Sequence, residues 1–236
     1  LTEHLPLFVA STVFWFALYE ASVRLSPLVF PQTFAAFKPI QKINWHSRVV
    51  ALVHAVLATA LCIPWINDPE LAKDPVFGYL YEASQYLAIT LGYFVWDVYI
   101  NVRYVKIWGP GFVLHGIIGL YLGIVVFRPL FNYYSPILVL NEMSTPFLNL
   151  HWFMDKLGLT GSKLQLVNGI ALLSTFFFSR LSYGMYWCVK LYLSVYFNMD
   201  RIPLYLSISI VLSLVSLNIL NIIWFTKMIR ALRSRF

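Results

Sequence analysis

The sequence predicts an all-α, polytopic membrane protein with about seven transmembrane helices. Of its 236 residues, 60% are hydrophobic and only 11% are charged, whereas soluble domains are nearer 45–50% apolar and about 25% charged. The uncharged apolar runs are about 20 residues long, which is the length that a helix needs to cross the hydrocarbon core of a bilayer. They do not alternate polar with apolar residues, so helices are the expected spanning structure.

The spans follow one another with short connections. In chain order they are expected at residues 5–23, 45–66, 78–104, 111–128, 133–152, 163–196 and 203–226. Proline and glycine mark the connections, for example in NDPELAKDP, KIWGPG and NMDRIP, because both residues disfavour helix interiors. The sixth span is long and contains Gly184, so we expect it to be tilted or kinked.

Lysine and arginine residues predict the orientation of the chain. Connections between seven spans alternate between two sides, and positive charge accumulates on the cytosolic side. One side has only Lys73, Arg128 and Arg201, whereas the other has Arg24, Lys38, Lys42, Arg48, Arg103, Lys106, Lys156, Lys163, Lys227, Arg230, Arg233 and Arg235. The C-terminus is therefore expected in the cytosol. Residues 1–40 are interpreted as the first transmembrane helix and a cytosolic linker, and residues 41–236 as the main membrane domain.

Several classes of function are not expected. The net charge of +7 would suit nucleic acid, but the basic residues gather at helix ends, where membrane topology signals belong. Cys62 and Cys188 lie in apolar segments and are interpreted as small buried hydrophobic residues. The spacings of zinc sites, nucleophile elbows and nucleotide-binding loops are absent, so we expect no metal and no resident cofactor. Because the chain begins at Leu1, we expect it to be a fragment of a longer protein.

Polar residues inside the spans are the candidate site, because ionisable groups within a membrane are costly. Five such residues lie in the cytosolic halves of five different spans. At a rise of about 1.5 Å per residue, their depth is roughly 6–15 Å from the cytosolic helix ends. They are His54, Asp97, His115, Glu142 and Asn168. His54, Asp97 and His115 within hydrogen-bond reach can do general acid–base work or hold a lipid headgroup. The alternative is a hydrogen-bonded knot that only fixes helix packing.

His46 and Arg48 stand at the mouth of the second span, eight and six residues before His54. We interpret them as a cationic entrance, although side chains at the interface also extend to headgroups without any further role. Arg180 lies deep in the sixth span and needs an acceptor or a water-filled cavity.

Five motifs in a fixed order resemble one family, the TLC domain of ceramide synthases and of TRAM-type translocon proteins. They are NWHSRVVALVHA, GYFVWDVYI, FVLHGIIG, NEMSTPFLNLHWFMDKLG and VNGIALLSTFFFSRL, and they cover about residues 40–230. The small TLC-domain transmembrane proteins are the most similar subgroup. The resemblance implies helices around a lipid-sized cavity, in the endoplasmic reticulum or a related endomembrane. It assigns His54, Asp97 and His115 to the polar centre, and Glu142, Ser144, Pro146, Asn149, Asn168 and Arg180 to the later motifs.

One position departs from the ceramide synthases. The resemblance implies two adjacent histidines in the fourth span and paired aspartates after them, but here Gly116 follows His115 and no aspartate pair is present. Acyl transfer needs a base or a nucleophile, so ordinary ceramide synthesis is not expected.

Two functions remain open. The first is a protein that binds, senses or transports lipid, either sphingolipid or phospholipid, for membrane lipid homeostasis. Its headgroup site would be His46, Arg48, His54, Asp97, His115, Glu142, Asn149, Asn168 and Arg180. The second is an acyltransferase that uses acyl-CoA as co-substrate, with His54, Asp97 and His115 as the catalytic set. Membrane lipid is the expected partner in both cases, and a homodimer is possible.

Overall fold

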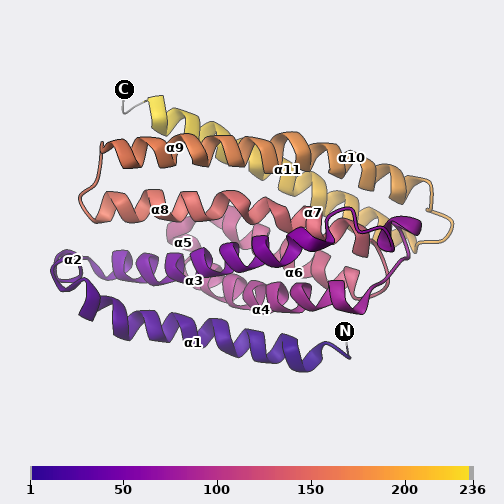
Figure 1. Ribbon diagram of the computed structural model, residues 1–236, viewed down its shortest axis with the longest axis horizontal. Helices are drawn as coiled ribbons and strands as arrows, with labels where there is room; N and C mark the ends of the chain where they lie inside the picture. The colour runs from indigo at the N-terminus through magenta and orange to yellow at the C-terminus, as the bar shows by residue number, and fades with distance from the viewer. Residues whose placement is uncertain (1, 234–236) are drawn as a thin grey trace.

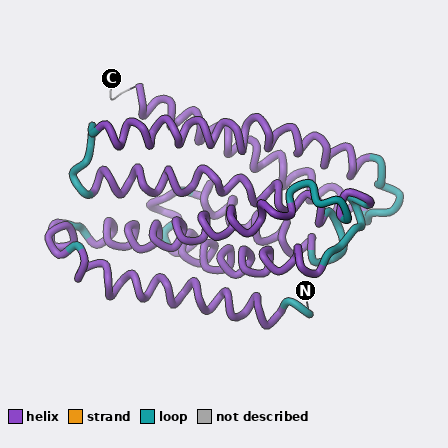
Figure 2. Tube along the Cα trace, viewed as in Figure 1, coloured by secondary structure: helices purple, strands orange, loops and turns teal. Residues whose placement is uncertain are grey.

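The computed structural model describes residues 2–233, and it is 84% helical with no strand in that part of the chain. Leu1 and Arg235, which entered the sequence predictions, lie outside the described residues. The long helices run roughly along one direction, and the connections gather at the two ends of the bundle (Figures 1 and 2). The all-α fold class is confirmed.

The helices fall in the seven expected ranges. The first four are α1 (Leu5–Val29), α3 (Pro39–Cys62), α4 (Tyr81–Arg103) and α6 (Pro110–Val126), with the short α2 (Pro31–Ala36) and α5 (Val105–Trp108) between them. The fifth range holds α7 (Ser135–Val139), η4 (Leu140–Ser144) and α8 (Thr145–Lys156). The sixth holds α9 (Lys163–Phe176), η5 (Phe177–Ser182) and α10 (Tyr183–Tyr196), and α11 (Leu204–Arg233) is the last. The expected boundary at residues 40 and 41 falls in the first turn of α3.

Six helical rods form a closed ring. Helix α3 packs against α8, α8 against α9, α9 against α11, α11 against α6, α6 against α4, and α4 back against α3. Helix α1 lies outside this ring, where it packs on α4 and α3. This arrangement leaves the inward faces of the six rods around a common interior.

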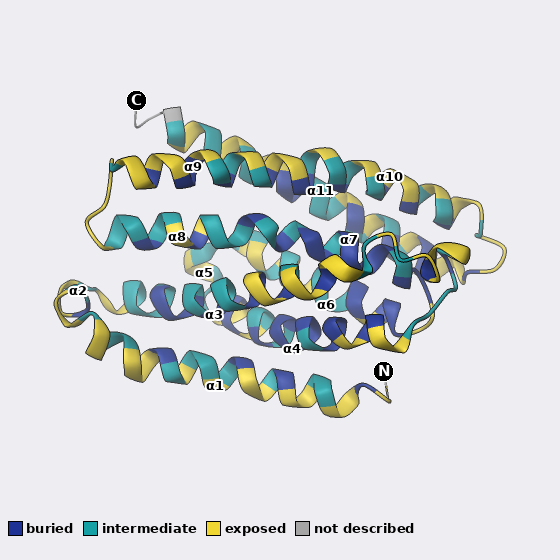
Figure 3. Ribbon diagram, viewed as in Figure 1, coloured by how far each residue is buried: buried dark blue, intermediate teal, exposed yellow. Residues whose placement is uncertain are grey.

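The outer faces of the bundle are apolar. Exposed side chains on these faces include Val13, Leu28, Val167, Ile170 and Leu212, and Figure 3 shows exposed residues along the outer sides of α1 and of α9–α10. A soluble protein rarely exposes apolar surface of this extent. The described helices that are long and apolar enough to cross a membrane are Leu5–Val29, Pro39–Trp65, Lys163–Tyr196 and Leu204–Leu232, and α6 is apolar but shorter. The chain is therefore a multi-pass membrane protein, and the count of about seven spans stays a prediction.

Two of the expected helices are not regular. The fifth span is interrupted by the 3-10 segment η4, and the sixth changes to π-helix in η5 before it reaches Gly184. The departure from regular α-helix therefore begins at Phe177, before Gly184 is reached. Each interruption contains one buried charged residue, Glu142 in η4 and Arg180 in η5.

Candidate functional site

A cavity of about 470 Å³ lies inside the ring, toward the end of the bundle that carries the C-terminus. Residues from α3, α4, α6, α8, α9 and α11 line it, together with residues of η4 and η5. Its volume is within the range of about 300–1,000 Å³ that is typical of small-molecule sites. The cavity is therefore a candidate binding site formed by the whole ring.

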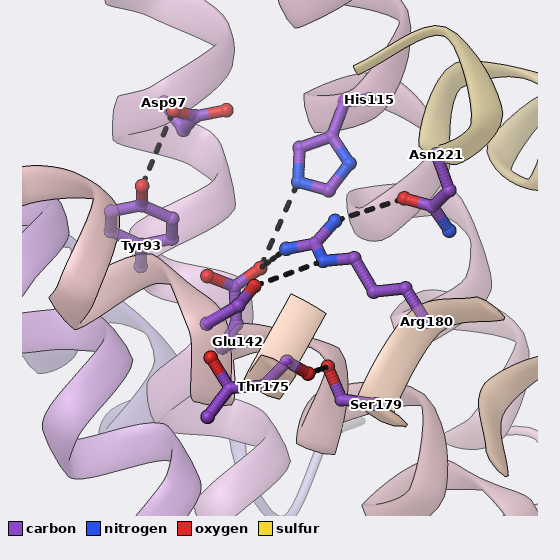
Figure 4. Close-up of polar contacts among 9 residues, drawn as sticks. Tyr93, Asp97, His115, Glu142, Thr175, Ser179, Arg180 and Asn221 are labelled. Atoms are coloured by element: carbon purple, nitrogen blue, oxygen red, sulfur yellow. Dashed lines mark hydrogen bonds and ion pairs between the residues drawn. The ribbon is translucent and has the colours of Figure 1, made fainter. Parts of the chain in front are cut away.

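Glu142, His115 and Arg180 form the floor of this cavity. Glu142 Oε1 lies 3.8 Å from Arg180 Nη2 and 3.8 Å from His115 Nε2. Figure 4 shows the three side chains converging from η4, α6 and η5. Because Glu142 and Arg180 are only 7% and 6% exposed, each charge is compensated mainly by the other rather than by solvent.

Arg180 is held on three further sides. Its Nη1 atom donates a hydrogen bond of 3.1 Å to Asn221 Oδ1, and its Nε atom donates one of 3.4 Å to Ser144 Oγ. The guanidinium carbon lies 5.0 Å from the centre of the Phe176 ring. A buried arginine with this many partners is fixed in one geometry.

A second, smaller chamber of about 80 Å³ lies beyond the floor. His115, Glu142 and Arg180 line both chambers. The remaining walls of the small chamber are mainly apolar and come from Leu87, Leu91, Phe94, Leu122, Val126, Leu138, Val139 and Leu217. The polar floor therefore separates a larger, mixed chamber from a smaller, apolar one.

Arg48 lies on the wall of the large cavity. Its Nη1 atom donates a 3.0 Å hydrogen bond to Asn149 Oδ1, and its guanidinium lies 4.9 Å from the centre of the Trp152 ring. Asn149 is buried and lines the same wall. Lys227 of α11, which is exposed, also lines this cavity, so a second cation borders it.

Asp97 also lines the large cavity. Tyr93, one turn earlier on α4, donates a long hydrogen bond of 3.4 Å from its hydroxyl to Asp97 Oδ1. The other carboxylate oxygen lies against α6 at Gly116, where an added Cβ atom would be only 2.7 Å from Asp97 Oδ2. The missing side chain at position 116 lets α6 pack closely on α4 beside this carboxylate.

His54 is not part of the cavity wall. It is 1% exposed, and its ring stacks on the Tyr93 ring with centroids 3.6 Å apart and planes 3° apart. Neither of its ring nitrogens has a hydrogen-bond partner among the described residues. The expected hydrogen-bonded set of His54, Asp97 and His115 is therefore not formed, because Tyr93 stacks on His54 and donates its hydroxyl hydrogen to Asp97.

His46 and Asn168 also lie away from the cavity lining. His46 shares a 2.9 Å hydrogen bond between its Nδ1 atom and Ser22 Oγ, so it faces α1 rather than the expected entrance. Asn168 donates a 2.9 Å hydrogen bond to the backbone carbonyl of Phe147 and joins α9 to α8. Of the predicted site residues, the structure brings together Arg48, Asp97, His115, Glu142, Asn149 and Arg180.

Several lining residues were not predicted. Asn221, Trp224 and Met228 come from one face of α11, and Tyr93 and Trp96 from one side of α4. Within each of these two sets the spacing is three or four residues, which places the members on one helix face. That periodicity was the available signal, but an aromatic stripe is equally typical of helix packing.

The family model of the TLC domain matches residues 44–230. The chain belongs to the TLC-domain family. The match includes the cavity-lining residues described above, from Asn44 to Met228.

Several known proteins are similar to this chain along nearly its whole length. A TLC domain-containing protein of Schizosaccharomyces pombe is 36% identical, over 100% of this chain and 81% of the relative. Human TLC domain-containing protein 4 is 29% identical over 94% of this chain and 85% of its own length. Topoisomerase I damage affected protein 4 of Saccharomyces cerevisiae is 27% identical, with coverages of 96% and 84%.

Proposed function

We propose that this TLC-domain protein binds a polar membrane lipid, and senses or transports it, as part of membrane lipid homeostasis. The observation that carries the proposal is the two-chamber cavity with a polar floor. The large chamber holds the headgroup beside Arg48, Lys227 and Arg180. The hydrocarbon chain runs along the aromatic and aliphatic wall of the large chamber, and the small apolar chamber takes a short section of it.

Physical chemistry supports this division. An apolar wall accepts a hydrocarbon chain from the bilayer at little cost, because both surroundings are apolar, and cations on a water-poor wall bind phosphate or sulfate groups strongly. Arg48 presents a planar fork that binds two oxygens of such a group at once. We place the protein in the endoplasmic reticulum or a related endomembrane, with its C-terminus in the cytosol, and a homodimer remains compatible with its exposed apolar faces.

The test fills the cavity without changing its charge. Ala51 of α3 lines the large chamber, and Ala60 of the same helix is exposed on the outside of the bundle. We expect Ala51→Trp to remove most of the lipid that copurifies with the protein, measured by mass spectrometry after extraction from washed detergent micelles. Ala60→Trp is the matched control and keeps its lipid. Equal lipid content in the two variants would refute the proposal.

A second function, acyl transfer from acyl-CoA to a lipid amine, is favoured by one observation. His115 Nε2 lies 3.8 Å from Glu142 Oε1, and His115 Nδ1 has no partner among the described residues. The nearby Glu142 carboxylate favours the tautomer with the proton on Nε2, and Nδ1 is then the base. It takes the proton of the attacking amine, the amide bond forms as the thioester bond breaks, and the proton passes to the leaving CoA thiolate.

This alternative has its own measurement. Purified protein is mixed with palmitoyl-CoA and a long-chain amine, and the free CoA thiol is measured with a thiol reagent. The acyl-transfer function requires thiol release that His115→Asn abolishes. If thiol release is equal with and without the protein, acyl transfer is excluded and lipid binding is the remaining function.

A further inference from the structure

Two opposite charges line the same cavity without forming an ion pair. Arg48 belongs to α3 and Asp97 to α4. The ion pairs of the cavity, within the described side chains, are those of Glu142 with His115 and with Arg180. Arg48 contacts the neutral Asn149 and the Trp152 ring, and Asp97 accepts a hydrogen bond from Tyr93. Neither side chain has an oppositely charged partner among the described side chains.

An uncompensated charge inside a membrane protein is costly, and such groups normally pair or mark a binding site. An ion pair between Arg48 and Asp97 would relieve that cost, but the two do not pair. Among the described side chains, neither has an oppositely charged group within 4.0 Å. A side chain at position 116 of α6 would touch Asp97 Oδ2, but the residue there is glycine and has no side-chain hydrogen-bond donor. Both charges therefore remain available to a ligand in the cavity.

We propose that the lipid headgroup in this cavity is zwitterionic, with its phosphate bound by Arg48 and its primary ammonium bound by Asp97. This inference rests on the lipid-binding function proposed above and names the class of lipid. A primary ammonium donates hydrogen bonds to the Asp97 carboxylate, and Trp96, Trp108 and Trp224 line the same chamber, where their ring faces attract a cation. A single bound molecule neutralises both walls at once.

The same geometry disfavours other headgroups. An anionic lipid without an amine places further negative charge near Asp97 and leaves that carboxylate unpaired. A simple long-chain amine satisfies Asp97 but leaves Arg48 and Lys227 without an anion. Selection therefore comes from two charges of opposite sign rather than from the size of the cavity.

The experiment measures headgroup preference in the full chain. Delipidated protein is incubated with mixed micelles that contain equal amounts of dioleoyl phosphatidylethanolamine, phosphatidylglycerol and phosphatidic acid, and bound lipid is counted by native mass spectrometry. We expect at least a tenfold preference for phosphatidylethanolamine. Asp97→Asn should reduce the preference to about onefold while lipid remains bound. Glu82→Gln, which removes an exposed acid from the same helix, should leave it unchanged.

A second measurement needs no variant and decides the matter where Asp97→Asn does not fold. N-acetylated phosphatidylethanolamine keeps the phosphate but cannot carry the ammonium charge, so wild-type protein should bind it no better than phosphatidylglycerol. Equal binding of phosphatidylethanolamine and phosphatidylglycerol by wild-type protein overturns the inference, as does an unchanged preference in Asp97→Asn. If wild-type protein retains none of the three lipids, the lipid-binding function itself has failed.

Discussion

Glu142 is the residue on which the polar floor depends, because one of its oxygens serves both Arg180 and His115. Its backbone lies in the short 3-10 segment η4, which turns the carboxylate inward between the two chambers. Removal of this acid leaves Arg180 as an uncompensated buried cation. The contributions of Glu142 and Arg180 to stability are therefore expected to be coupled, because loss of either one leaves the other charge buried and unpaired.

A double-mutant cycle tests this coupling. We expect Glu142→Gln to destabilise the protein by about 3–5 kcal/mol, the usual cost of leaving one partner of a buried pair. The double variant with Arg180→Met should lose less stability than the sum of the two single variants, because no lone charge remains. Thermal unfolding in detergent provides the measurement. Glu70→Gln is the control, since the Glu70–Lys73 pair is exposed and exposed pairs contribute little; additive effects at 142 and 180 would contradict the coupling.

Gly116 provides a prediction on packing. A Cβ atom there would lie 2.7 Å from Asp97 Oδ2 and 3.0 Å from Val98 Cγ2, so Gly116→Ala should cost about 1–3 kcal/mol through overpacking. At Gly111 of the same helix the added atom would meet only Leu220 Cδ2, at 3.4 Å. Gly111→Ala should be neutral or slightly stabilising, because alanine favours helix. The measurement is the unfolding temperature of each variant in detergent. If Gly116→Ala unfolds at the same temperature as Gly111→Ala or at a higher one, the close approach of α6 to α4 is not required.

The helices that carry the site are the ones that depart from regular geometry. In η5 the backbone is π-helical over Phe177–Ser182, and this segment places Arg180 between Asn221, Ser144 and Glu142. Such π-segments are rare and recur at functional sites. Irregular backbone inside a membrane is tolerated where it lines a cavity, which is where both η4 and η5 lie.

Deletion of Phe178 tests the role of the π-helical segment. Phe178 is exposed on the outside of the bundle, and without it the segment can return to regular α-helix. A π-helical turn contains one extra residue, so its removal keeps α9 and α10 nearly in phase and changes the backbone mainly around Arg180. Arg180 then loses the backbone geometry that places it between Glu142 and Asn221, although both helices keep their packing. We expect lower stability and loss of copurified lipid. Deletion of Thr160, in the connection between α8 and α9, is the control; unchanged lipid after loss of Phe178 would contradict this role of η5.

These elements also show what the sequence predicts and what it does not. Hydrophobic runs gave the ranges of the helices, because apolar length is a direct requirement of the bilayer. Glu142 and Arg180 were expected inside spans, but the interruptions that carry them depend on tertiary packing and leave no periodic signal. The sequence predicts His46 at the entrance and His54 in the polar centre, eight residues further along the same helix. Their rotation toward α1 and against Tyr93 follows from neighbours that the spacing does not specify.

The molecule as a whole has an apolar outer surface and a charged interior layer toward one end. The cavity lies toward the end that holds α5, the α8–α9 connection and the end of α11. The excess of lysine and arginine in the connections predicts that this end faces the cytosol. A lipid with its headgroup in the cavity would then enter from the cytosolic leaflet.

Cysteine labelling in cells tests the orientation. Thr160 lies between α8 and α9 and Asp200 lies between α10 and α11, at opposite ends of the bundle (Figure 1). After the plasma membrane is permeabilised, Thr160→Cys should react with a membrane-impermeant maleimide and Asp200→Cys should not. The native Cys62 and Cys188 are buried and provide the background signal. If only Asp200→Cys is labelled, the orientation of the protein is the reverse of the predicted one.

The most direct test of the central claim, that this cavity holds a polar lipid, is an electron cryo-microscopy map in lipid nanodiscs with an antibody fragment bound. We expect elongated density inside the ring, with its compact end between Arg48 and Asp97 and its tail passing His115 toward Leu91 and Val126. The Ala51→Trp variant should lack this density while its helices superpose on those of the wild type. A wild-type cavity closed by its own side chains, or filled only by separate water-sized peaks, would contradict the account.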